Sequence, residues 1–481
     1  MTEESHNQIN FERRWKALAV ISIVQFILLL DATVVNVALP HIKQDLGFTA
    51  SSLTWVVNAY LVAAGSLLLL GGRIGDAFGL RRVLQTGIAV FGAFSLLATF
   101  SPSAALLIVG RAGQGVGEAL AGATALGMVS LLFPSGPERN KAFSIWAALG
   151  GLGSIVGVLL SGMITEYLSW RWIFGINIPI TLILSVAIVI FVPKISKQKS
   201  ARLDISNALI LAFSVSMIVL GIIGSGIEQT YWLRLALTLL GLIGVIWVVL
   251  RCKRMENGII PARLITRSPR ITGYVIVGML AASSGALFYL GVLILQDSLG
   301  MTPMQAGLAW LPFCLGFFPG LFLFQYVTKR WNLQTAAMVG LIISAAGFIL
   351  FATGISGLDY WTRVLPAMLV TSVGFGCVSP VAQSLSTLDL SEADVGAGSG
   401  ITSTIQQLFQ VGGVTLFVAV AVASADGVGV STTIQPLGFT IAFSLIAVVL
   451  ISGVILIWSK GTVLASNSDH QKNDAKPANS Q

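Results

Sequence analysis

The chain of 481 residues is 55% hydrophobic and only 10% charged, and a soluble domain of this size needs more polar surface than that. This composition therefore indicates a lipid bilayer as the surroundings of most of the chain. The formal net charge of +8 falls mainly on the segments between apolar runs, so we expect no nucleic-acid partner.

Mostly apolar runs of about 18 to 28 residues, each able to cross about 30 Å as a helix, recur along the whole chain. The first six cover residues 16–39, 52–72, 83–101, 104–132, 142–165 and 173–193, and two more cover 205–225 and 231–251. The last six cover 271–295, 304–327, 334–354, 362–387, 397–423 and 435–458. The sequence thus predicts an all-α membrane protein with fourteen transmembrane helices.

The loop lengths and the basic residues predict the organisation of these helices. Six-helix bundles are expected at 16–193 and 271–458, with a two-helix insert at 205–251 between them. By count, about 23 of the 28 Lys and Arg residues lie in the terminal segments and even-numbered loops, which are cytoplasmic by the positive-inside rule. We therefore expect a bacterial cytoplasmic membrane, a cytoplasmic N-terminal segment at 1–15 and a disordered cytoplasmic tail at 461–481.

Histidine chemistry is not expected within the membrane. His6, His41 and His470 all lie outside the apolar runs, so they form neither a buried metal cluster nor a buried proton relay. No metal site is predicted, and buried proton chemistry must use carboxylates.

Three charged residues lie deep inside apolar runs, away from the ends: Asp31, Arg111 and Glu118. A charge at the bilayer centre costs at least about 2.5 to 3.5 kcal/mol, so such residues usually face a wet cavity and take part in function. Counting from the helix ends places Asp31 and Arg111 at similar depth, where they could pair. Burial favours the neutral acid and a nearby arginine favours the carboxylate, so this pair is our candidate for proton coupling.

Glu118 lies two helical turns beyond Arg111, with Gln114 between them on the same helical face. It is the candidate for a second proton site or for an anchor of a cationic substrate. The competing interpretation is structural, namely a buried ion pair for Asp31 and Arg111 and a packing role for Glu118.

The loop after the second run contains glycines, an acid and two arginines in the order Gly72, Asp76, Gly79, Arg81 and Arg82. Glycines permit a tight turn, and an aspartate is stabilised at the positive N-terminus of another helix. We therefore predict a conformational latch between Asp76 and the segment 396–400. The simpler alternative is an ordinary positively charged cytoplasmic turn.

Small residues in the fifth run, among them Gly153, Gly157 and Gly162, allow helix backbones to approach closely. Plain helix packing is the competing interpretation of this motif.

A second group of polar and aromatic residues could line a central substrate cavity that suits lipophilic cations, although single aromatics could equally face lipid. This group consists of Gln25, Asn36, Trp55, Asn58, Tyr60, Gln114, Ser284, Tyr289, Trp310, Gln407 and Gln410.

Several spaced motifs resemble those of a known family. Residues 30–40 read LDATVVNVALP, and residues 169–179 read SWRWIFGINIP. Together with the glycine and arginine loop at 72–82, they resemble the fourteen-span drug:proton antiporter branch of the major facilitator superfamily, which includes quaternary-ammonium multidrug exporters. The resemblance covers residues 15–458. In the fifth run, where the family has its antiporter motif, Val158 stands in place of a proline and Ser161 in place of a glycine. Glu118 stands where the family more usually has a smaller residue.

This resemblance implies a major facilitator fold that exports hydrophobic or cationic small molecules in exchange for protons, by alternating access. It implies no cofactor, because a proton gradient supplies the energy. Export of a single metabolite or antibiotic, and proton symport, remain alternatives within the same class. From other classes, a non-transporting membrane sensor or a membrane enzyme would need a signalling domain or a catalytic cluster, and neither is visible. The oligomeric state is left open, a monomer being one possibility.

Overall fold

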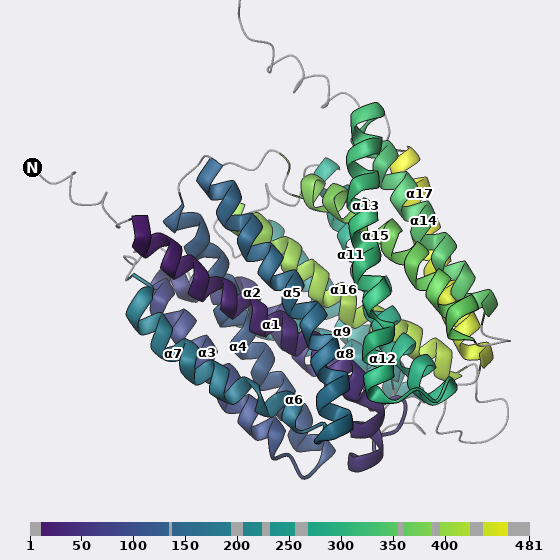
Figure 1. Ribbon diagram of the computed structural model, residues 1–481, viewed down its shortest axis with the longest axis horizontal. Helices are drawn as coiled ribbons and strands as arrows, with labels where there is room; N and C mark the ends of the chain where they lie inside the picture. The colour runs from purple at the N-terminus through teal and green to yellow at the C-terminus, as the bar shows by residue number, and fades with distance from the viewer. Residues whose placement is uncertain are drawn as a thin grey trace, which may run out of the picture. The chain divides into compact units, whose positions relative to one another are not determined.

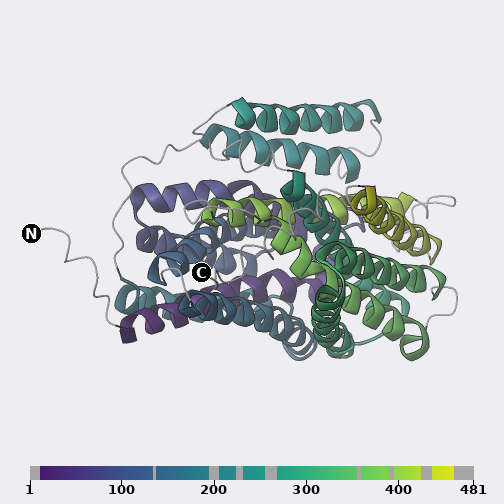
Figure 2. The same cartoon turned by 90° about the horizontal axis from the view of Figure 1, so that it is seen from above.

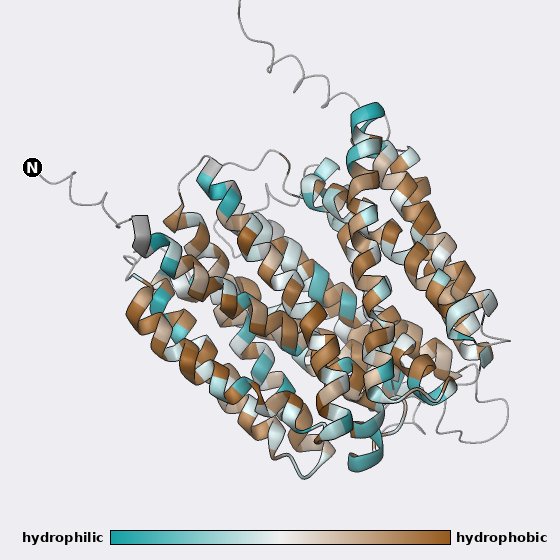
Figure 3. Ribbon diagram, viewed as in Figure 1, coloured by the Kyte–Doolittle hydropathy of each residue, from teal (hydrophilic) through white to brown (hydrophobic). Residues whose placement is uncertain are grey.

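The computed structural model describes residues 11–133, 137–193, 205–223, 231–254, 268–354, 359–386, 388, 395–423 and 436–459. Within these residues, fourteen helices are long and apolar enough to cross a membrane, which confirms the predicted number. Hydrophobic residues make up most of the length of the helices, and hydrophilic residues are more frequent toward the helix ends (Figure 3). The expected disordered tail at 461–481 lies outside the described residues.

The chain divides into two compact units, which are described separately. The first comprises Met1–Pro261 with Gly300–Leu308, and the second comprises Ala262–Leu299 with Ala309–Gln481.

Ten α-helices lie wholly or mostly within the described residues of the first unit (Figure 1). They are α1 (Phe11–Leu46), α2 (Thr54–Phe78), α3 (Leu80–Thr99), α4 (Ala104–Leu132), α5 (Pro137–Tyr167), α6 (Trp172–Gly175), α7 (Asn177–Phe191), α8 (Ile205–Ile223), α9 (Tyr231–Arg254) and most of the short α12 (Pro303–Ala309). Helix α1 packs on α5, α4 packs on both α2 and α3, and α7 packs on α3. Helices α8 and α9 pack against each other, and α8 also contacts α2 (Figure 2).

The second unit contains the remaining elements. They are α11 (Ser268–Leu293), the π-helical segment η2 (Ile294–Ser298), α13 (Leu311–Arg330), α14 (Leu333–Gly354), the π-helical segment η4 (Tyr360–Val364), α15 (Leu365–Ser386), α16 (Val395–Ala423) and α17 (Pro436–Ser459). Helix α15 packs on α13 and α14, α14 also packs on α17, and α11 packs on α16.

Several helices extend beyond their apolar runs. Helix α1 continues through Pro40 to Leu46, although its apolar run ends at residue 39. His41, which follows this apolar run, therefore lies in the last turns of α1. An apolar run ends where the chain leaves the lipid, whereas a helix ends where its backbone hydrogen bonds stop. The end of the apolar run and the end of the helix therefore differ.

Candidate functional site

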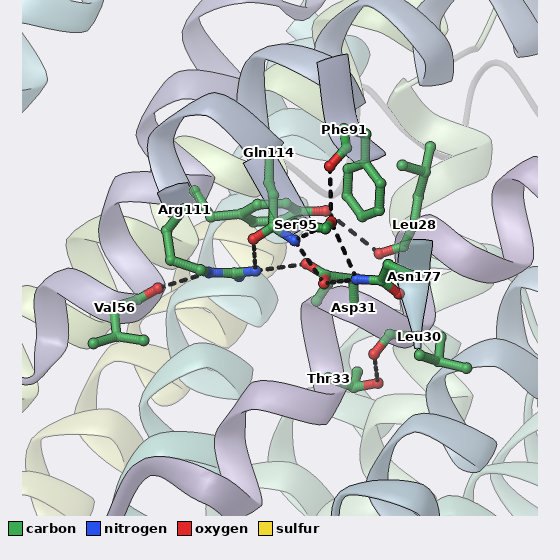
Figure 4. Close-up of polar contacts among 12 residues, drawn as sticks. Leu28, Leu30, Asp31, Thr33, Val56, Phe91, Ser95, Arg111, Gln114 and Asn177 are labelled. Carbon is green, nitrogen blue, oxygen red and sulfur yellow. Dashed lines mark hydrogen bonds and ion pairs between the residues drawn. The ribbon is translucent and has the colours of Figure 1, made fainter. Parts of the chain in front are cut away.

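The predicted pairing of Asp31 with Arg111 is confirmed. Asp31 lies in α1 and Arg111 in α4, and Arg111 Nη1 is 2.5 Å from Asp31 Oδ2 (Figure 4). The exposed fractions of the two residues are 0% and 1%. The two charges are therefore held against each other in a region closed to solvent, where an ion pair is strongly coupled.

Arg111 is held by further contacts from two helices. Its Nε donates to the Val56 carbonyl on α2 at 3.0 Å, and its Nη1 donates to Gln114 Oε1 at 2.8 Å. The guanidinium also lies over the Tyr60 ring, 4.3 Å from the ring centroid, which is favourable for a cation. Arg111 is thus fixed in one orientation toward α1.

The second oxygen of Asp31 accepts two amide hydrogen bonds. Gln114 Nε2 donates to Asp31 Oδ1 at 3.1 Å, and Asn177 Nδ2, from the start of α7, donates at 2.6 Å. The Ser95 hydroxyl on α3 accepts from Gln114 at 2.8 Å and donates to the Phe91 carbonyl at 2.7 Å. We call Asp31, Ser95, Arg111, Gln114 and Asn177 the carboxylate cluster.

Two members of the carboxylate cluster were missed from the sequence. Asn177 belongs to the motif at 169–179, which could have indicated it, but it was given no role. Ser95 is a small hydroxyl residue within an apolar run, and no spacing or motif singles it out. Both are fully buried. Ser95 reaches Gln114 because α3 packs on α4, and Asn177 reaches Asp31 because α7 contacts α1.

The chemistry available to the carboxylate cluster is the exchange of one proton on one acid. Both Asp31 oxygens accept hydrogen bonds, so the carboxylate is well solvated by protein groups although it is buried. Among the described residues, no group of three or more His, Cys, Asp or Glu side chains comes together.

Glu118 lies outside the carboxylate cluster but is connected to it. It is half-buried on α4, and its side chain interacts with the buried Tyr60. The Tyr60 hydroxyl also lies 3.4 Å from the Leu28 carbonyl, and the Tyr60 ring contacts Arg111. Tyr60 thus lies between the second acid and the ion pair.

Most residues of the predicted latch lie in helix ends, which corrects the loop that we expected from residue 72 onward. Gly72 and Asp76 lie in the last turns of α2, and Arg81 and Arg82 lie in the first turn of α3. Gly79 joins the two helices with φ of 99°, a backbone conformation that favours glycine.

The latch itself stays a prediction. Arg81 donates a hydrogen bond to the Val189 carbonyl of α7, which ties the turn to its own unit. Asp76 is half-buried, and its predicted partner, the segment 396–400, belongs to the other unit.

The glycines of α5 lie where backbones approach closely. A Cβ atom at Gly153 would lie 2.4 Å from the Phe26 carbonyl oxygen, and one at Gly157 would lie 2.7 Å from the Leu30 oxygen. At Gly162 the nearest atom would be the Pro303 oxygen, at 2.6 Å. The packing interpretation of this motif is therefore supported, and Gly157 places α5 directly beside the residue that precedes Asp31.

The candidate cavity residues fall in both units. In the first unit, Gln114 belongs to the carboxylate cluster, and Tyr60 contacts the Arg111 side chain of that cluster. Asn36 donates hydrogen bonds to carbonyls of its own helix. Asn58 is buried, and Gln25 and Trp55 are half-buried. In the second unit, Tyr289 and Trp310 are fully buried, and Ser284, Gln407 and Gln410 are half-buried. Trp310 stacks on Phe288 with ring centroids 4.7 Å apart. A cavity shared by all these residues stays a prediction.

Fourteen helices that can cross a membrane, together with an ion pair buried between α1 and α4, are characteristic of a polytopic membrane carrier. The sequence profile described as Major Facilitator Superfamily matches residues 21–414, and the chain belongs to this family. It is therefore a transporter and not an enzyme.

Curated relatives and solved structures agree with this assignment. The puromycin resistance protein pur8 of Streptomyces alboniger is 32% identical over 460 residues, which cover 93% of this chain and 91% of that protein. The lincomycin resistance protein of Streptomyces lincolnensis is 31% identical, with 92% and 91% covered. A crystal structure of the peptide transporter POT in complex with sulfate superposes with a TM-score of 0.68 at 15% identity, covering 93% of this chain and 95% of that one, and this likeness shows the fold.

Proposed function

We propose that this transporter exports hydrophobic or cationic small molecules, antibiotics among them, across the bacterial cytoplasmic membrane in exchange for protons. The observation that carries the proposal is the fully buried contact between Asp31 and Arg111. The relatives named as antibiotic resistance proteins support export as the direction. The basic residues of the sequence support cytoplasmic termini.

The proposed coupling depends on the charge of Asp31. The ionised acid holds α1 against α4 through Arg111, and protonation would remove that attraction. The two forms of Asp31 therefore favour different packings of α1 and α4. A transporter that binds its proton from one side and releases it to the other uses such a difference to bias its conformation.

Glu118 is proposed as the anchor for a cationic substrate or as a second proton site. It is acidic and half-buried in a membrane helix, and Tyr60 connects it to Arg111. A positively charged substrate bound near Glu118 would change the field at the ion pair, so substrate and proton would affect each other through one tyrosine.

A narrower function is the second candidate. The relatives are named for single antibiotics, puromycin in one and lincomycin in the other. Export of one antibiotic or metabolite is therefore an alternative to broad drug export. Resistance across a panel of unrelated compounds separates the two, because a narrow exporter protects against one chemical family.

The test is a dye and drug efflux panel in a host without its own pumps, with purified protein then measured in proteoliposomes. The variants are Asp31→Asn and Glu118→Gln, with Asp45→Asn as the control because Asp45 forms a solvent-exposed ion pair on the same helix. We expect Asp31→Asn to abolish efflux driven by a pH gradient and Asp45→Asn to preserve it. Full proton-driven efflux by Asp31→Asn would overturn the mechanism, and substrate uptake together with protons would indicate symport.

A further inference from the structure

Asn177 uses only one end of its side-chain amide. Its Nδ2 donates to Asp31 Oδ1 at 2.6 Å and reaches Ser95 Oγ at 3.5 Å. Its Oδ1 is buried and accepts no hydrogen bond from any described residue (Figure 4). A buried amide oxygen left in this way is costly, so the arrangement calls for a functional explanation.

A protonated Asp31 would need an acceptor, because a neutral carboxyl group donates through its O–H. The neighbouring oxygens are already engaged. Gln114 Oε1 accepts from Arg111, and the Ser95 hydroxyl donates to the Phe91 carbonyl while it accepts from Gln114. Among the described members of the carboxylate cluster, the Asn177 oxygen is the acceptor that receives no hydrogen bond.

We propose that Asn177 is a positioning residue that accommodates both charge states of Asp31 by rotating its amide. With the carboxylate ionised, Nδ2 donates to Asp31, as the structure shows. With the acid protonated, the amide turns by half a rotation and Oδ1 accepts the O–H. The proton stays on Asp31, and one N–H···O bond is replaced by one O–H···O bond.

The rotation requires little rearrangement. The two ends of an asparagine amide have nearly the same size and shape, so the side chain turns within the space that it already fills. Gln114 does not have this freedom, because its oxygen is held by Arg111 while its nitrogen is held by Asp31 and Ser95. The two amides of the carboxylate cluster therefore have different roles.

The hydrogen bonds that the structure gives to Asp31 come from Arg111, Gln114 and Asn177. Arg111 on α4 has only donors, Tyr60 on α2 stacks on Arg111, and Glu118 on α4 interacts with Tyr60. Helices α3 and α7 contribute the neutral Ser95 and Asn177. Helix α6 contains no titratable residue, and the titratable residues of α5 lie near its two ends.

This inference rests on the proposed function, because it assumes that Asp31 is the proton carrier. It predicts the direction of a measurable shift. A hydrogen bond to an ionised group is roughly twice as strong as a neutral one, so removing the amide destabilises the carboxylate more than the acid. The pH midpoint for protonation of Asp31 should therefore rise, by about half to one pH unit, when Asn177 is replaced.

The test is infrared difference titration of the purified full-length protein. The carboxylic acid band of Asp31 is identified by its loss in Asp31→Asn. In the unsubstituted protein we expect this band to appear on acidification together with a change in a side-chain amide band. In Asn177→Leu the amide change should be lost, the acid band should move to higher frequency and its midpoint should rise. Asn177→Ala serves the same purpose if the leucine variant does not fold.

The control is Asn207→Leu, which removes another buried asparagine, on α8 outside the carboxylate cluster, and should leave both bands unchanged. A purely structural Asn177 would lower the unfolding temperature without moving the midpoint or the acid band, and that result overturns the inference. Absence of any Asp31-dependent acid band would instead overturn the proposed proton carrier, and the inference with it.

Discussion

Asp31 and Arg111 are 80 positions apart in the chain, yet their side chains meet at 2.5 Å with at most 1% of either exposed. The two charges compensate each other in a place that water does not reach. Breaking a buried pair by removing one partner leaves an uncompensated charge, so the effect of one substitution depends on the other residue.

Arg111→Ala should destabilise the protein by about 3 to 5 kcal/mol, because it leaves the Asp31 carboxylate buried without its cation. Adding Asp31→Asn to that variant should restore part of the loss, because the uncompensated charge is then gone. Thermal unfolding in detergent measures both effects. Arg171→Ala is the control, since its pair with Asp45 is solvent-exposed and should contribute at most about 1 kcal/mol. A double variant no more stable than Arg111→Ala would contradict this prediction.

Glu118→Gln should reduce export of permanently cationic compounds by about tenfold, which corresponds to losing about 1.4 kcal/mol of attraction. Neutral compounds should be affected less, because the glutamine keeps the size and polarity of the side chain. Transport assays with matched cationic and neutral dyes measure the ratio. The control is Glu138→Gln, because the Glu138 side chain is exposed in its pair with Arg14. An equal loss for both dye classes would argue against a role in recognising charge.

Gly153→Ala should destabilise the contact between α1 and α5 by about 1 to 3 kcal/mol, because a new methyl group cannot fit into a filled space without moving a backbone. The Cβ atom would lie 2.4 Å from the Phe26 carbonyl oxygen. Gly151→Ala is a matched control two residues away, where no atom lies within 4 Å of the new carbon. Unfolding temperatures should fall for the first variant and stay the same or rise for the second. Equal effects would show that packing at Gly153 is looser than the structure indicates.

The start of η4 should fray in acid. Hydrogen bonds from the Thr362 amide and hydroxyl, at 2.8 Å each, lower the pKa of Asp359 below its ordinary value. A lowered pKa means that the stabilisation is complete above the ordinary value and is lost as pH falls through the lowered value. Amide hydrogen exchange at Thr362, corrected for the intrinsic rate, should therefore speed up at acidic pH. Asp359→Asn, which keeps an acceptor without the charge, should remove this pH dependence.

The sequence predicted the helices well because lipid imposes a simple rule on composition. Each span needs a run of apolar residues, so all fourteen were recognised. Their limits were harder to predict, as α1 shows, because a membrane helix can continue into polar residues such as His41. The ion pair was also predictable, since Asp31 and Arg111 are charges inside apolar runs.

The remainder of the carboxylate cluster depends on tertiary packing. Gln114 could be associated with Arg111 because residues three apart share a helical face. Ser95 and Asn177 are neutral residues on α3 and α7, and only the packing of those helices brings them to Asp31. No periodicity records which helices are neighbours. Neutral hydrogen-bonding partners are therefore the part of such a site that a sequence alone conceals.

The bonds to Asp31 also determine how far the influence of one proton extends. Side chains from α4 and α7 bind this carboxylate of α1 directly, and Ser95 of α3 is bonded to both of its amide neighbours. A change of charge at this single position would alter the attachment of several helices at once. The change of charge on Asp31 and the resulting change in helix packing would then begin at the same atoms. No further residues would be needed to connect the two.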